Sequence, residues 1–148
     1  MQIMSNLIFI LHLASTWFMT GLIWFVQIVH YPLYDRIGSE SFVEYERVHC
    51  SLTTLVVAPV MLTELLTGLA LFADKPKFAG TLELVANMAL LGVIWLSTMF
   101  IADQLHGQLG VQFSPQVHRS LVLWNWLRTV AWTIRGLLLA YLVARGFK

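Results

Sequence analysis

The chain has 148 residues, of which 58% are hydrophobic, and nine basic and eight acidic residues give it a net charge of +1. This balance excludes a nucleic-acid-binding protein, which needs a strongly basic surface. The single cysteine, Cys50, excludes an internal disulfide. Length and apolar content together indicate one integral membrane domain over residues 1–148.

Four apolar stretches are long enough to cross a bilayer, which takes roughly 20 mostly apolar residues. They cover about residues 5–30, 51–73, 84–102 and 120–144. The connections between them are short, so consecutive helices run antiparallel. The sequence therefore predicts an all-α, up-down-up-down bundle of four transmembrane helices, and leaves a homo-oligomer open.

Four of the five histidines occur at corresponding helix ends. His30 ends the first predicted helix, His49 begins the second, His106 follows the third and His118 precedes the fourth. In an antiparallel bundle these four positions share one membrane face. His12 is placed near the opposite end.

Two acid-x-x-His pairs also fall at this face. Glu46 and His49 are three residues apart, as are Asp103 and His106, so each acid and its histidine share one side of a helix. Di-iron carboxylate bundles use the same spacing, but the higher histidine content here favours zinc, copper or a histidine-rich iron site. The predicted ligands of a mononuclear or dinuclear metal site are His30, Glu46, His49, Asp103, His106 and His118.

An ordinary polar rim in the headgroup region is the competing interpretation, because histidines, tyrosines and acids are common at helix ends there. Cys50 is expected to be a small core residue rather than a ligand.

Ionisable residues also occur inside the predicted helices. Glu64 and Arg135 lie at nearly the same depth, with His12 in the same half of the bundle. Because a lone charge in the membrane is unfavourable, these three are expected to form a buried ion-pair group.

Asn125, Arg128 and Trp132 recur at helical spacing on one face of the fourth predicted helix. Arginine would not face lipid, so this face is expected to line an internal pocket that binds a lipophilic molecule. Arg128 has no obvious acidic partner within the membrane. We expect its charge to be balanced by a site carboxylate such as Glu46 or Asp103, or by an anionic or carbonyl-bearing ligand.

Positively charged residues are slightly more frequent on the side of the two termini. They are Lys75, Lys77, Arg145 and Lys148 on that side, against Arg36, Arg47 and Arg119 on the other. The positive-inside rule therefore predicts cytoplasmic termini.

The stretches GLIWFVQIVHYPLY, YERVHCSLTTLVVAP and NWLRTVAWTIRG resemble those of a family of small four-helix bacterial integral membrane proteins, over nearly the whole chain. Short motifs are also distantly similar to the anthrone-oxygenase-like membrane family. They comprise Gly21, Phe25, His30, Pro32, Asn125, Arg128 and Thr129. The resemblance implies a bacterial inner-membrane protein that handles an aromatic or quinone-like molecule. The histidine cluster departs from that pattern, so its chemistry is not carried over.

Three functions remain open from the sequence. The first is a metal-dependent membrane oxidoreductase that uses the predicted site and the adjoining pocket. The second is a b-type haem protein in which two outer-face histidines are the axial ligands. The third is a transport or structural bundle in which His12, Glu64 and Arg135 form a relay.

Overall fold

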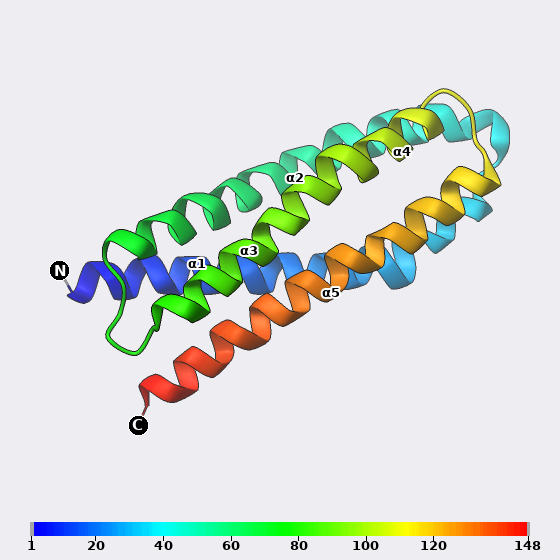
Figure 1. Ribbon diagram of the computed structural model, residues 1–148. Helices are drawn as coiled ribbons and strands as arrows, with labels where there is room; N and C mark the ends of the chain where they lie inside the picture. Colours follow the sequence, from blue (N-terminus) through cyan, green and yellow to red (C-terminus); the bar gives the residue numbers. More distant parts are fainter. Residues whose placement is uncertain (1, 148) are drawn as a thin grey trace.

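The computed structural model describes residues 2–147, so Lys148, one of the basic residues used to predict orientation, lies outside the described residues. Within this range the chain is helical and contains no strand. Long helices alternate in direction, and both ends of the chain lie at the same end of the bundle (Figure 1). The predicted all-α, up-down-up-down four-helix bundle is confirmed.

Two of the four long segments contain a change of helix type. The first runs through α1, a π turn (η1) and a 3₁₀ turn (η2), and the third runs through α3, a π turn (η3) and α4. The elements are α1 Gln2–Phe25, η1 Val26–His30, η2 Pro32–Arg36, α2 Ser39–Ala73, α3 Thr81–Ser97, η3 Thr98–Ala102, α4 Asp103–Leu109 and α5 Pro115–Gly146.

All four segments are long and apolar enough to cross a membrane. They are Gln2–Arg36, Ser39–Ala73, Thr81–Leu109 and Pro115–Gly146. Large apolar side chains such as Leu55, Leu66 and Leu123 point out of the bundle. An apolar outer surface of this extent suits contact with lipid, and it identifies a multi-pass membrane protein.

The helices extend beyond the apolar stretches predicted to contain them. α2 begins at Ser39 rather than near residue 51, because apolar composition marks the span but not the helix end. Phe42 and Glu46, four residues apart, are already buried against the bundle there. Glu46 therefore lies about 10 Å inside α2, at 1.5 Å per residue, and not at its start.

Sequence signals fix the start of α5. Pro115 occupies the first turn, where its missing N–H is not needed, and the Ser114 hydroxyl accepts a hydrogen bond from the Val117 backbone N–H. This start sets the positions of His118, Asn125 and Arg128 along the helix.

Candidate metal centre

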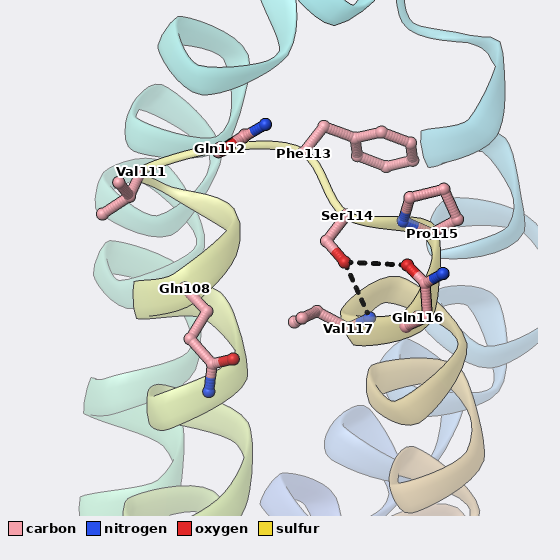
Figure 2. A pocket seen from close by; sticks show the side chains of 8 residues that line it. All are labelled: Gln108, Val111, Gln112, Phe113, Ser114, Pro115, Gln116 and Val117. Atoms are coloured by element: carbon pink, nitrogen blue, oxygen red, sulfur yellow. Dashed lines mark hydrogen bonds between the residues drawn. The ribbon is translucent and has the colours of Figure 1, made fainter.

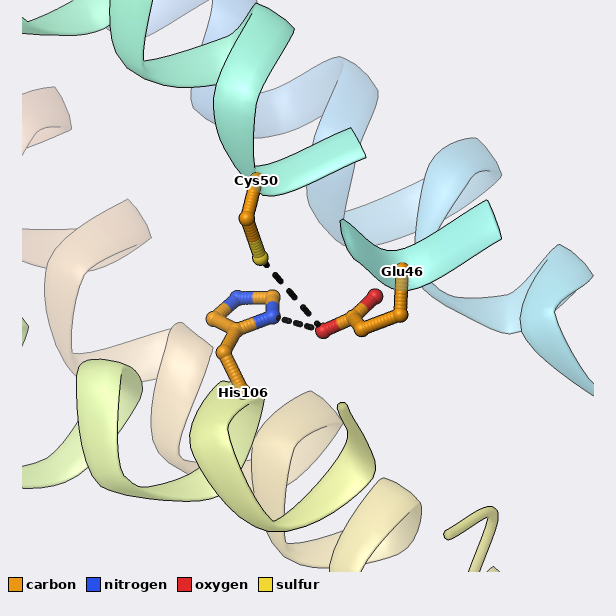
Figure 3. Close-up of side chains that lie close together, drawn as sticks. All are labelled: Glu46, Cys50 and His106. Carbon is orange, nitrogen blue, oxygen red and sulfur yellow. Dashed lines mark hydrogen bonds and ion pairs between the residues drawn. The ribbon is translucent and has the colours of Figure 1, made fainter. Parts of the chain in front are cut away.

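Three potential metal ligands converge at the outer end of the bundle, the end opposite the termini. Glu46 and Cys50, one turn apart on α2, face His106 of α4 (Figure 3). One ligand atom from each lies within 4.8 Å of the others. The α2–α4 contact thus brings oxygen, sulfur and nitrogen donors to one place.

Glu46 is the most buried member of this group, with 1% of its surface exposed. Its Oε1 atom lies 2.5 Å from Nδ1 of His106 and 3.7 Å from Sγ of Cys50. Its Oε2 atom is buried and makes no hydrogen bond of ordinary geometry among the described residues, and the same holds for the Tyr34 hydroxyl, although that hydroxyl lies close enough to interact with the Glu46 carboxylate. A buried carboxylate oxygen without a partner is unfavourable, and a bound cation would satisfy it.

The separations can be compared with those around a zinc ion. Bond lengths of about 2.0–2.3 Å place tetrahedral ligand atoms about 3.3–3.8 Å apart. The distance of 3.7 Å between Cys50 and Glu46 already matches this spacing. The contact of 2.5 Å between His106 and Glu46 is shorter, so these two atoms would have to move apart to bind one zinc ion.

His30 and His49 form a second pair beside this group. Nε2 of His30 lies 2.9 Å from Nδ1 of His49, which is also 3.1 Å from the Thr53 hydroxyl. The His49 ring centre is 5.7 Å from that of His106. The structure therefore places His49 between His30 and His106, although His30 and His49 do not belong to the ligand group found among the described residues.

The other two predicted ligands do not belong to the ligand group among the described residues. His118 is buried and hydrogen-bonded through Nε2 to the Tyr31 carbonyl at 2.7 Å, with Asp35 2.9 Å from its Nδ1. The Tyr34 ring stacks on His118 and also touches His49, so it stands between them. Asp103 is exposed on α4 and belongs to no ligand group found among residues 2–147.

A chain of hydrogen bonds leads from the centre towards the middle of the bundle. Nε2 of His106 lies 2.9 Å from the Tyr31 hydroxyl, which accepts a hydrogen bond from Arg128 at 3.4 Å. Arg128 also donates to Asn125 at 2.6 Å. With Nδ1–H of His106 donating to Glu46, every bond in this chain has one donor and one acceptor.

Arg128 and Asn125 also line a narrow slot between α5 and the segment from α3 to α4. Trp132, predicted to share their pocket, does not line it. Its indole N–H donates instead to the Glu64 carboxylate at 3.1 Å.

The buried charges form a separate network nearer the termini. Glu64 is paired with Arg135, and both are fully buried. Arg135 donates to Asn87 at 3.1 Å, and His12 bridges Asn87 and Thr67. All four long segments contribute to this network, in which Asn87 connects His12 with Arg135.

A wider hollow than the slot at Arg128 lies away from these groups. It is an open concavity of about 660 Å³ at the turn between α4 and α5, lined by residues such as Gln108, Gln112 and Phe113 (Figure 2). None of the predicted site residues lines it, so it has no part in the candidate centre.

Sequence reasoning missed three features of this site. Cys50 was expected in the core, although its position four residues after Glu46 is a signal for a shared helix face. The hydroxyls of Tyr31 and Tyr34 and the two π turns have no comparable signal. Both π turns come directly before site residues, η1 before Tyr31 and η3 before α4. Such turns are often found at functional sites.

Comparisons of the chain with protein families, with curated proteins and with solved structures found no match.

Proposed function

We propose that the protein is a metal-binding integral membrane protein whose centre is built by Glu46, Cys50 and His106. The observation that supports this proposal is the convergence of three different donor atoms at Oε1 of Glu46, a carboxylate whose second oxygen is buried without a hydrogen bond among the described residues. Three protein ligands leave a fourth position open on a tetrahedral metal, as in catalytic zinc sites. His30 and His49 stand beside that position.

The chemistry of the three ligands limits which metals the centre would bind. A thiolate and an imidazole suit zinc and copper, and a carboxylate is compatible with both. Copper, or iron bound with the adjacent histidines, can change between two oxidation states, as an oxidoreductase requires. If the protein is an enzyme, we propose an oxidoreductase that acts on a lipophilic substrate. The slot at Arg128 supports this, because Arg128 is hydrogen-bonded to Tyr31, which is hydrogen-bonded to His106 of the centre.

Binding of haem by His30 and His49 would require a larger rearrangement of the structure than binding of a single metal ion. A porphyrin must lie between its two axial ligands, but the rings of His30 and His49 are hydrogen-bonded to each other at 2.9 Å. These rings would have to separate before iron could bind between them. The geometry therefore supports a non-haem centre better.

Elemental analysis of protein purified without added metal tests the proposal. We expect stoichiometric zinc, copper or iron in the wild type, its loss in His106→Ala and Cys50→Ser, and its retention in Asp103→Asn. Copper or iron supports the oxidoreductase, whereas zinc alone contradicts it and leaves metal binding intact. A sharp Soret band would instead establish the haem protein. Metal-free wild-type protein that also fails to bind added zinc overturns the proposal.

A further inference from the structure

Arg128 is a buried guanidinium whose charge is not neutralised. It is 8% exposed, and no Asp or Glu forms an ion pair with it within residues 2–147. Its hydrogen bonds go to neutral oxygens: Asn125 at 2.6 Å, Tyr31 at 3.4 Å and Thr98 at 3.5 Å. An arginine within a transmembrane segment is unfavourable without a counter-charge.

Arg135, which lies deeper in the bundle, differs from Arg128 because an acidic residue of the bundle neutralises its charge. Glu64 is paired with Arg135 directly, and Asn87 accepts from it as well. At Arg128 the acceptors are all neutral, and the nearest helix faces contribute hydroxyl and amide oxygens. Arg128 is therefore provided with positioning contacts but with no anion.

The slot beside Arg128 has space for an anionic group. About 10 Å³ of it is open to a water-sized group, which is room for about one oxygen atom. Trp124, 50% exposed, lines the slot together with the half-buried Ile101 and Leu105. The slot thus has a charged inner wall and an apolar opening towards the lipid-facing surface.

We propose that this slot binds the carboxylate of a single-chain lipophilic acid. One carboxylate oxygen fills this space and forms a charge-assisted contact with the guanidinium, and the bulkier tetrahedral phosphate suits the narrow slot less well. The acyl chain lies along Ile101, Leu105 and Trp124, in contact with lipid. This inference rests on the proposed function in one respect: it names the class of substrate for the pocket proposed there. Binding of the acid itself does not require the metal.

Native mass spectrometry of the full chain in detergent tests the site, with palmitate as the probe. We expect wild-type protein to bind one palmitate, and to bind 1-hexadecanol, which has the same chain without the charge, far more weakly. Arg128→Gln should reduce palmitate binding on the order of 10- to 100-fold, the effect of losing a charge-assisted contact. Arg47→Gln is the matched control, because Arg47 is exposed and pairs with Glu44 on the surface.

A second variant tests the slot without removing the charge. Ile101→Phe narrows the opening and should weaken palmitate binding, whereas Val130→Phe, at an exposed position of α5, should not. Equal binding of palmitate by wild type and Arg128→Gln, or equal binding of hexadecanol, overturns the inference. Tighter binding of lysophosphatidate than of palmitate also overturns it, in favour of a phosphate ligand.

Zinc binding measured on the same samples separates this inference from the proposed function. His106→Ala should lose zinc and keep palmitate, and Arg128→Gln should keep zinc and lose palmitate. A wild type that binds palmitate but no metal refutes only the metal centre. A wild type that binds metal but no palmitate refutes only the acid site.

Discussion

At the scale of single residues, Glu46 decides whether the outer end of the bundle is a metal site. One of its oxygens contacts His106 and Cys50, and the other is buried without a partner among the described residues. A cation bound beside this second oxygen would offset the cost of burying it. The carboxylate charge is therefore the central requirement of the centre.

Glu46→Gln keeps the shape of this side chain and removes its charge. We expect the affinity for zinc to fall at least about 100-fold, more than the loss of an outer-shell partner produces. Competition with a chromophoric chelator measures it. Glu44→Gln, an exposed position on the same helix, is the control and should bind zinc like the wild type. Equal affinities in Glu46→Gln and the wild type would remove Glu46 from the site.

Tyr31 is the outer partner of a ligand, since its hydroxyl lies 2.9 Å from Nε2 of His106. Such partners fix the ring orientation of a ligating histidine, and their loss reduces metal affinity about 10- to 100-fold. We expect this range for Tyr31→Phe in the same chelator competition. Tyr141→Phe, at an exposed position of α5, should have no effect. An unchanged affinity in Tyr31→Phe would show that His106 does not need this contact.

At the scale of helices, the sequence predicts which segments meet but not how each is rotated. Ala102, His106 and Leu109 recur at four- and three-residue spacing on the inward side of η3 and α4. Asp103 follows Ala102 by one residue and is turned by about 100°, so it faces outward. The acid-x-x-His pattern alone could not show whether Asp103 or Ala102 faces the centre together with His106. The π turn η3, which sets the rotation of α4, leaves no pattern in the sequence.

The pair of Glu64 and Arg135 was predictable from the sequence, because two opposite charges at one depth must find each other. Their link to Trp132, Asn87 and His12 was not predictable, because it depends on how four helices are rotated about their axes. This network joins all four long segments. We therefore assign it a structural role in holding the helices together.

The stability of variants tests that role. Glu64→Leu or Arg135→Leu alone leaves a buried charge unpaired, and each should lower the free energy of unfolding by about 3–5 kcal/mol. The double variant removes both charges and should be more stable than either single variant. Denaturation of purified protein in detergent measures all three. A double variant as unstable as the sum of the two singles would exclude this pairing.

At the scale of the whole molecule, composition determines the architecture. Four apolar stretches with short connections have few arrangements other than an antiparallel bundle, and this part of the fold follows from the sequence. Orientation in the membrane rests on the small excess of basic residues near the termini. We propose that the termini are cytoplasmic.

Labelling of single cysteines tests this orientation. In a Cys50→Ser background, Lys77→Cys lies in the connection between α2 and α3, and Gln112→Cys lies in the turn between α4 and α5. A membrane-impermeant maleimide added to intact cells should label Gln112→Cys but not Lys77→Cys, which reacts only after lysis. The reverse pattern would place the metal centre at the cytoplasmic face.

The central claim is that Glu46, Cys50 and His106 bind one metal together, and X-ray absorption spectroscopy of the zinc-loaded protein tests it most directly. The proposed centre predicts one sulfur at about 2.3 Å from zinc, with nitrogen and oxygen ligands at about 2.0–2.2 Å. In Cys50→Ser the sulfur should disappear while the lighter ligands remain. A wild-type shell without sulfur, or one that Cys50→Ser leaves unchanged, would contradict the centre.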